Sequence, residues 1–270
     1  MIDNKLNFKY GGEKFEVSSK NLPPILKWIK SNSRVLELGS ASGYMTKYLK
    51  NELKCNVTCV ELNTEMAKLS EVYSENMIVE NLDNDYWINS IDGTFDYILI
   101  ADVLEHLRNP QNLLKNAIKF LKKDGEILIS IPNIAHSSVI FTLYDGDFTY
   151  QELGLLDNTH IHFFTWKTFN KMMLDLNLEL LDECSKYKSP GCTELKKFII
   201  THPLISFLVI FRKDVFVYQF VTKWKISNTP NNNKFKIKRH LSFYCFIKMI
   251  IDDCSYFFYY HLYKKYKETK

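Results

Sequence analysis

A glycine-punctuated loop carries the clearest chemical signal in this sequence. The apolar run from Val35 to Leu38 contains one acid, Glu37, and is followed by Gly39, Ser40 and Gly43. The run predicts a strand that turns tightly into a helix, and such a loop brings backbone N–H groups close to a small ligand. The spacing Glu-x-Gly-x-x-x-Gly favours a ligand that has adenosine and an amino-acid tail but no phosphate.

A dinucleotide is the alternative ligand for such a loop. Its fingerprint is Gly-x-Gly-x-x-Gly, in which the second glycine lets the backbone close on a pyrophosphate. Ala41 and Tyr44 stand where the second and third glycines would fall. The spacing therefore disfavours a nicotinamide cofactor, although a nicotinamide-dependent oxidoreductase on the same type of sheet stays open.

Two further acids follow predicted strands. Cys55 to Glu61 alternates and is rich in β-branched residues, which predicts a second strand that ends in Glu61. A carboxylate about 20 residues after the glycine loop is placed to accept hydrogen bonds from ribose hydroxyls. Met77 to Val79 predicts a third strand, after which Asp83 could accept a hydrogen bond from an adenine amino group. A solvated acid at Glu61 and a turn-forming Asp83 are the structural alternatives.

The elements that must position these residues alternate between strand and helix. Phe95 to Ile100 is nearly all apolar, as in a strand buried on both faces, and Glu126 to Ile131 repeats the pattern. Between them, Pro110 opens a helix that runs to about Leu121, with Lys122–Gly125 as its C-terminal stop. This alternation predicts an α/β fold with a doubly wound, Rossmann-like, mostly parallel sheet and helices on both faces.

The motifs VLELGSASG, CVELN, FDYILIADVLEHLRNP and LKKDGEILISIPN, in this order over residues 30 to 135, resemble the class I S-adenosylmethionine-dependent methyltransferases. The bacterial group that modifies small molecules and surface-glycan precursors is the most similar, and the likeness continues through residues 147 to 165. The resemblance implies seven strands, with Val215 to Val221 as an antiparallel strand at the sheet edge. Many relatives have glycine where this chain has Ala41, and alanine is accommodated if that residue has a negative φ.

The resemblance also implies which residues bind the cofactor S-adenosylmethionine, whose product is S-adenosylhomocysteine. The loop and the strand ends would supply Glu37, Gly39, Ser40 and Gly43 to the methionine and ribose part, Glu61 to the ribose, Leu62, Leu82 and Asp83 to the adenine, and Asp102 and Val103 to the transferred methyl. The protein would mainly align an acceptor in line with the S–CH3 bond and exclude water. A neutral hydroxyl acceptor would also need a general base.

Histidines are the candidates for that base. His160 is the first candidate, because it lies in the segment where such enzymes place acceptor-binding insertions, and His106 follows the fourth strand. A packing role is the alternative for each of them. Further candidates in the insertion are Asp157 for catalysis and His136, Tyr150 and His162 for substrate binding. The spacing of the histidines does not match a preformed metal site, so no metal is expected.

The chain divides into three parts by composition. Residues 1–226 are expected to form the methyltransferase domain with an acceptor-binding insertion at about 133–165, residues 227–233 a linker, and residues 234–270 a basic, aromatic-rich helical tail. The N-terminus predicts a short hairpin around Gly11 and Gly12 and then a helix over 22–30. After the insertion, the pattern predicts a helix over Trp166–Leu176, a strand over Leu178–Asp182, and two short helices on either side of Pro203.

Charge is concentrated in the tail. Residues 234–270 hold nine Lys/Arg and three Asp/Glu, a net charge of +6, whereas the whole chain carries +4. The tail could pack on the catalytic domain or on a second copy in a homodimer. It could also make a peripheral contact with an anionic membrane; nucleic acid is the least favoured partner. Charges interrupt the apolar residues, so the tail is a poor membrane span.

The remaining composition favours a cytoplasmic enzyme, with membrane association left open. The six cysteines are scattered, which favours reduced thiols, and the N-terminus lacks the apolar core of a signal peptide. The predicted reaction is O-methylation of a small or carbohydrate- or phosphate-linked acceptor in surface-polysaccharide biosynthesis. A non-catalytic cofactor-binding module that acts through the basic tail is a further alternative.

Overall fold

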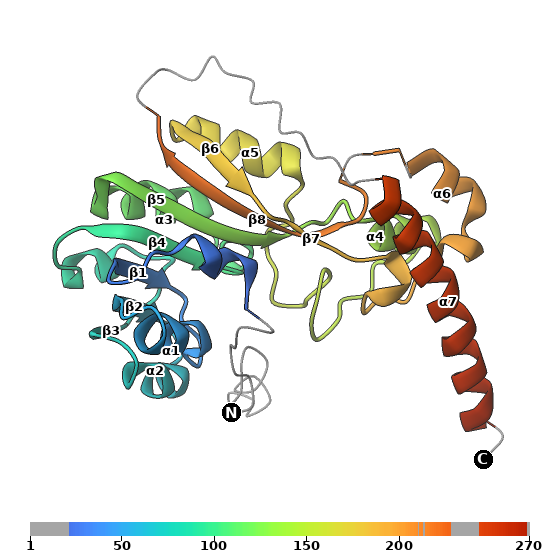
Figure 1. Ribbon diagram of the computed structural model, residues 1–270, viewed down its shortest axis with the longest axis horizontal. Helices are drawn as coiled ribbons and strands as arrows, with labels where there is room; N and C mark the ends of the chain where they lie inside the picture. Colours follow the sequence, from blue (N-terminus) through green and yellow to red (C-terminus); the bar gives the residue numbers. More distant parts are fainter. Residues whose placement is uncertain (1–21, 210, 213, 228–242, 269–270) are drawn as a thin grey trace. The chain divides into compact units, whose positions relative to one another are not determined.

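Apolar runs between residues 34 and 132 form five parallel strands in the computed structural model, which describes residues 22–209, 211–212, 214–227 and 243–268. They are β1 (Arg34–Leu38), β2 (Asn56–Glu61), β3 (Asn76–Val79), β4 (Phe95–Ala101) and β5 (Leu121–Pro132). The strands lie in the order β3-β2-β1-β4-β5 (Figure 1), with β1 paired in parallel to both β2 and β4. The predicted doubly wound, Rossmann-like sheet is confirmed.

Two antiparallel segments complete the sheet. Strand β8 (Val217–Ile226) lies between β5 and β6 (Leu178–Glu183) and pairs antiparallel with β6, and the two-residue β7 (Lys186–Tyr187) also pairs with β8. The predicted antiparallel strand is therefore confirmed, but its predicted place at the sheet edge is wrong, because β6 takes the edge. Val217, Phe220 and Trp224 are completely buried, as an interior strand requires.

The helices that follow β1, β2, β4 and β5 in unit 1 and at its border are short, and two of them start at side-chain caps. They are α1 (Tyr44–Asn51), α2 (Thr64–Glu71), α3 (Pro110–Ala117) and α5 (Trp166–Asp175), with single 3₁₀ turns at Pro24–Trp28, Tyr86–Ser90, Leu104–His106 and Ile118–Phe120. The Asn63 side chain accepts hydrogen bonds from two N–H groups in the first turn of α2. Asn109 caps α3 in the same way, with Pro110 in its first turn.

The segment between α3 and β5 differs from the sequence expectation. Lys122–Gly125 was expected to stop a helix, but these residues belong to β5, which begins at Leu121. Leu121 pairs with Phe95 of β4 and Glu126 pairs with Tyr97, so Lys122–Gly125 forms an irregularity of β5 between these two pairs. Pairing with a neighbouring strand therefore overrides the local pattern of lysines followed by glycine.

The chain folds into two compact units. Unit 1 contains Met1–Ile131, Phe169–Cys184 and Val221–Asn233, and unit 2 contains Pro132–Thr168, Ser185–Phe220 and Lys234–Lys270. The centre of unit 1 lies around β1, where Val35, Leu36 and Leu38 have no exposed surface. The predicted insertion at 133–165 falls within unit 2, together with a later part of the chain and the tail.

Unit 2 is built mainly from helices. They are α4 (Ser137–Tyr144), α6 (Pro203–Val209), α7 (Phe243–Glu268) and two 3₁₀ turns at Pro190–Cys192 and Ile199–Thr201. The two short helices beside Pro203 and the helical tail were expected, whereas α4 was not. Helix α4 starts at His136, whose Nδ1 accepts a hydrogen bond from the N–H of Ser138. Histidine is a rare cap, so this helix start has a weak sequence signal.

Two sequence expectations fall outside the described residues. These are the hairpin around Gly11 and Gly12 and nearly all of the linker at 227–233. Within the described residues, none of the helices combines the length and the apolar character that crossing a membrane requires.

Candidate functional site

The loop between β1 and α1 has a left-handed backbone at three positions. Gly39, Ala41 and Gly43 have φ values of +80°, +47° and +78°. A Cβ on Gly39 would lie 2.5 Å from Val103 Cγ2, and one on Gly43 would lie 2.7 Å from Ser70 Cα. The loop therefore needs both glycines, because they leave the backbone bare where it approaches its neighbours.

Ala41 departs from the expected negative φ. Its φ is positive, and its N–H donates a 2.8 Å hydrogen bond to Glu61 Oε2. A left-handed alanine costs roughly 1–2 kcal/mol relative to the right-handed conformation, and the charged hydrogen bond offsets part of this cost. The expectation for Ala41 was wrong because it considered the residue without its partner on β2.

Glu37 is a buried acid at the end of β1. Only 1% of its surface is exposed, and its Oε2 accepts a 2.7 Å hydrogen bond from the hydroxyl of Thr46. Burial raises the pKa of Glu37 to about 7. Its second oxygen, Oε1, and the buried hydroxyl of Ser40 find no hydrogen-bond partner in the described part of the chain.

Glu61 ends β2 and lies beside the glycine loop. Its two carboxylate oxygens accept hydrogen bonds from the N–H groups of Ala41 and Asn63 at 2.8 and 2.9 Å. Each carboxylate oxygen can accept a further bond, so the ribose prediction is compatible with this geometry. The next residue, Leu62, is 63% exposed and offers an apolar surface at the same strand end.

The predicted adenine residues follow β3. Leu82 is buried, and Asp83 Oδ1 accepts a 2.7 Å hydrogen bond from the N–H of Arg108. A carboxylate oxygen can also accept a hydrogen bond from an adenine amino group. The structure thus places both residues in unit 1, on the segment that leads away from the β3 strand end.

The end of β4 supplies Asp102 and Val103. Asp102 has a φ of +54° and accepts a 3.2 Å hydrogen bond from Ser130 of β5. Val103 is the side chain that contacts Gly39, so the β4 end and the glycine loop lie side by side. A left-handed aspartate beside the loop is a strained conformation of the kind that functional sites retain. His106 follows in the 3₁₀ turn at Leu104–His106, where its N–H donates to the carbonyl of Val103.

Tyr44 also belongs to this region, beyond standing where a dinucleotide-binding loop would have its third glycine. Burial raises the pKa of Tyr44, and the nearby carboxylates of Asp102 and Glu37 raise it further. Its hydroxyl is therefore a neutral donor close to two acids. Its place directly after Gly43, at the first position of α1, is the signal that could have identified it.

These residues fit an adenosyl cofactor with a cationic amino-acid end. Glu37 and Ser40 present buried polar atoms that lack a described partner, and a buried acceptor of this kind is costly unless a ligand satisfies it. The bare glycines give a ligand access to the backbone, and Glu61 retains acceptor capacity. The ten predicted cofactor residues all belong to unit 1.

The candidate acceptor residues belong to unit 2. His160 is 7% exposed, and its backbone N–H donates a hydrogen bond to the carbonyl of Asp157. The Asp157 carboxylate is buried and accepts bonds from the N–H and hydroxyl of Thr159 at 2.8 and 2.7 Å. Asp157 therefore shapes the loop that presents His160.

Aromatic rings surround this loop within unit 2. Phe163 contacts the rings of Phe148, Tyr150 and His160 at centroid distances of 5.8, 6.4 and 6.2 Å. Tyr150 is 52% exposed, so the cluster presents an open aromatic face. His162 contacts the ring of Phe164 instead.

His136 has a different environment from the other predicted substrate residues. It is completely buried, its Nδ1 accepts from the N–H of Ser138, and its Nε2 lies 3.0 Å from the carbonyl oxygen of Lys188. A carbonyl only accepts, so Nε2 carries the proton. Neither ring nitrogen is left for an acceptor molecule, and the structure makes His136 the cap of α4.

Comparisons with known proteins agree with the geometry of unit 1. A family model described as a methyltransferase domain matches residues 10–183. The chain is 27% identical over 117 residues to (S)-coclaurine N-methyltransferase from Thalictrum flavum subsp. glaucum, which covers 42% of this chain and 32% of that protein. It is 24% identical over 110 residues to ubiquinone biosynthesis O-methyltransferase from Xanthomonas euvesicatoria pv. vesicatoria (strain 85-10), covering 38% and 44%. The chain thus spans less than half the length of either relative.

Solved structures share the fold. A SAM-dependent methyltransferase from Methanosarcina mazei aligns with a TM-score of 0.51 and 15% identity, covering 76% of this chain and 98% of that one. A SAM-dependent methyltransferase from Archaeoglobus fulgidus aligns with a TM-score of 0.50 and 20% identity, covering 74% and 89%. Because the family model matches more than half of the sequence, this chain belongs to the methyltransferase-domain family.

Proposed function

We propose that this chain is an S-adenosylmethionine-dependent methyltransferase. The observation that carries the proposal is the pair of buried polar atoms, Glu37 Oε1 and Ser40 Oγ, beside a loop that requires Gly39 and Gly43. Membership of the methyltransferase-domain family supports it.

Different residues of unit 1 would bind different parts of the cofactor. Glu37, Ser40 and the two glycines would hold the amino-acid part, and Glu61 would accept from the ribose. Leu62, Leu82 and Asp83 would hold the adenine, and Asp102 and Val103 would flank the reacting end. When bound, the cofactor supplies an electrophilic methyl group on a positively charged sulfur. The carboxylate of Asp102 favours such a cation, and so does Glu37 in its ionised form.

Unit 2 supplies the candidates for acceptor binding. We assign the base role to His160, which a neutral hydroxyl acceptor requires, and a loop-shaping role to Asp157. The open aromatic face of Tyr150 suits the apolar face of a sugar or another flat ring. An acceptor oxygen that is already anionic needs no base, in which case His160 binds rather than removes a proton.

The finer proposal is O-methylation of a small or carbohydrate-linked acceptor, such as a surface-polysaccharide building block. It is supported by the sequence likeness over residues 147 to 165 and by an O-methyltransferase among the relatives. The N-methyltransferase among them makes a nitrogen acceptor the competing outcome.

Calorimetry tests the cofactor assignment. We expect S-adenosylmethionine and S-adenosylhomocysteine to bind and NAD not to bind. Glu61→Ala should weaken binding by on the order of 1–3 kcal/mol, because charge-assisted hydrogen bonds to the ribose are lost. Glu65→Ala is the matched control, since Glu65 is an exposed acid that pairs with Lys68. Equal losses in both variants, or binding of NAD alone, would contradict the proposal.

Turnover tests the acceptor side. His160→Ala should lower the rate of S-adenosylhomocysteine formation far more than it lowers cofactor affinity, and His160→Gln should behave in the same way. Equal losses in rate and affinity would assign His160 to packing. Mass spectrometry of cell-extract fractions incubated with a labelled methyl donor would identify the acceptor.

A further inference from the structure

The stretch from Phe198 to Phe211 exposes apolar side chains that a folded protein normally buries. It contains no Lys, Arg, Asp or Glu and includes the short helix α6. Three of the exposed residues, Leu204, Phe207 and Leu208, have the spacing i, i+3 and i+4, which places them on one face of α6. Phe211 follows the helix, and its ring centroid lies 6.1 Å from that of Phe207. The exposed fractions are 67% for Leu204, 68% for Phe207, 64% for Leu208 and 78% for Phe211.

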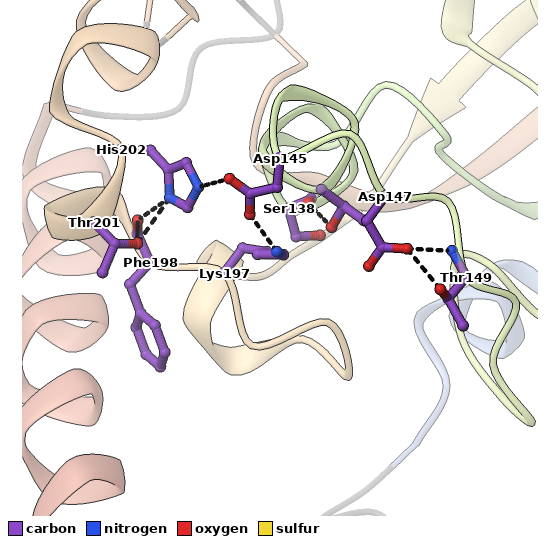
Figure 2. A network of polar contacts seen from close by, with 9 residues as sticks. Ser138, Asp145, Asp147, Thr149, Lys197, Phe198, Thr201 and His202 are labelled. Carbon is purple, nitrogen blue, oxygen red and sulfur yellow. Dashed lines mark hydrogen bonds and ion pairs between the residues drawn. The ribbon is translucent and has the colours of Figure 1, made fainter.

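The opposite side of this stretch attaches it to unit 2 through polar groups (Figure 2). His202 is buried, and its Nε2 lies 3.0 Å from Asp145 Oδ1. Its ring also stacks on that of Phe141. Ser206 is also buried, and its hydroxyl donates to the carbonyl of Ile199. The inner side of α6 is only partly apolar: Ser206 and Val209 lie beside Phe141, Val215 and Phe216. The largest apolar side chains of the helix are on the exposed side instead.

Helix α7 holds the beginning of the same stretch. Asp253 is completely buried and accepts hydrogen bonds from the N–H groups of Gly191 and Ile199 at 2.6 and 2.8 Å. Phe198 is buried against the rings of α7, with Phe257 at 5.2 Å. These contacts fix the position of the stretch within unit 2, so α6 is exposed although the segment before it is firmly held.

Length and charge indicate what covers this face. The uncharged stretch is shorter than the roughly 20 residues that cross a bilayer, but it is of the length that lies in a membrane interface. Lys196 and Lys197 precede it in the sequence, and Arg212 and Lys213 follow it. Lys197 pairs with Asp145 and Arg212 with Asp214, so the four cations together still exceed these two acids. The tail from 234 to 270 adds nine Lys/Arg against three Asp/Glu. An apolar face with basic residues on both sides complements anionic lipid.

We propose that the α6 face, formed by Leu204, Phe207 and Leu208 of the helix and by Phe211 just after it, docks on the surface of an anionic lipid membrane. The apolar side chains enter the boundary between headgroups and acyl chains, and the flanking cations contact the headgroups. A second copy of the chain would bring its own flanking cations against these, which does not favour a symmetric contact. The face belongs to unit 2, and the inference does not depend on methyl transfer.

Vesicle flotation of the full-length protein tests this proposal. We expect the protein to float with vesicles of phosphatidylcholine and phosphatidylglycerol, and to float much less with phosphatidylcholine alone or at high salt. The double substitution Phe207→Asp with Phe211→Asp should reduce the floated fraction at least about tenfold. Val72→Asp is the matched control, because Val72 is 70% exposed in unit 1 and lies outside the proposed sites.

Folding and assembly are measured on the same samples. Circular dichroism and sedimentation velocity of the double variant must match the parent protein; Phe207→Ser is the milder variant if they do not. Flotation that depends on both anionic lipid and the α6 face supports the proposal. Absence of flotation, or equal flotation of the variant, overturns it. A dimer that the variant dissociates, without flotation of the parent, also overturns it and assigns the face to a second copy.

Discussion

Each of the two units buries an ionisable side chain, but the two side chains differ in how fully they are hydrogen-bonded. Glu37 in unit 1 is 1% exposed and His136 in unit 2 is 0% exposed. Burial favours the neutral form of both, so it raises the pKa of Glu37 to about 7 and lowers the pKa of His136 to about 4. Glu37 keeps one oxygen without a described partner, whereas both nitrogens of His136 are bonded.

This difference separates a binding group from a structural one. A buried acceptor without a partner costs stability, and a protein retains it where a ligand completes it. A buried histidine with two bonded nitrogens only holds its helix. In unit 2 the unfavourable free energy arises at the surface instead, because the apolar side chains on one face of α6 are exposed to water. The four predictions below test this contrast.

Glycine substitution should have the largest effect. Gly43 and Gly146 have nearly the same φ, +78° and +75°, but a Cβ at Gly43 meets Ser70, whereas one at Gly146 meets no described atom within 4 Å. Gly43→Ala should lower the free energy of unfolding by roughly 2–5 kcal/mol through strain and overpacking. Gly146→Ala should cost only the strain, roughly 1–2 kcal/mol. Urea unfolding measures both, and equal losses would refute the tight packing at Gly43.

The Glu37 carboxyl should make stability fall as pH rises. Its pKa goes from 4.5 in the unfolded chain to about 7 in the folded protein. Between these values the folded protein keeps a proton that the unfolded chain has lost, so stability declines across this window by about 3 kcal/mol. Glu37→Gln cannot ionise and should lack this decline. Urea unfolding of both proteins from pH 4.5 to 8 measures the difference, and parallel profiles would argue against a protonated Glu37.

The His136 imidazole should have the opposite pH dependence. Its pKa goes from 6.5 to about 4 on folding, so the unfolded chain binds a proton that the folded protein excludes. Stability should therefore fall by about 3 kcal/mol as pH drops from 6.5 to 4. His136→Asn keeps a helix-capping side chain but has no ionisable ring, so its stability should change little between pH 6.5 and 4. Protection of the α4 amides from hydrogen exchange, measured as a function of pH, reports this stability within unit 2. The same loss of protection at low pH in both proteins would be evidence against a neutral, buried His136.

The smallest effect is expected at the edge of the α6 attachment (Figure 2). Lys197 pairs with Asp145, which also contacts His202. The bonds from Lys197 and His202 hold the pKa of Asp145 below its usual range. Both partners are partly exposed, so Lys197→Met should cost only about 0.2–1 kcal/mol, and less at high salt. Thermal unfolding at two salt concentrations checks this, and a larger, salt-independent loss would mean that the lysine stem packs in the interior.

Much of unit 1 could be predicted because its signals are local. The glycine spacing and the buried runs of β1 and β4 each follow from a few neighbouring residues. The same patterns identified Glu61 at a strand end beside the loop, where the structure places it. Tyr44 was missed as a member of the site, because its burial beside Asp102 depends on β4.

The errors concern residues whose conformation depends on distant partners. The φ of Ala41 depends on Glu61, 20 residues away. Lys122–Gly125 lies in β5 because Leu121 and Glu126, on either side of it, pair with β4. Helix α4 starts at a histidine that is bonded to Lys188, 52 residues further along the chain. No local pattern contains these partners.

Residue order and periodicity were sufficient for the α/β class, the glycine loop and the acids at the strand ends, because backbone conformation and burial periodicity are short-range properties. Long-range packing was needed for the rest. It placed β8 inside the sheet and exposed the apolar side chains on one face of α6. It also left one oxygen of Glu37 without a described hydrogen-bond partner, whereas both ring nitrogens of His136 are bonded. Solvation and hydrogen bonding of a side chain depend on which remote segments pack against it, and linear sequence does not specify those neighbours.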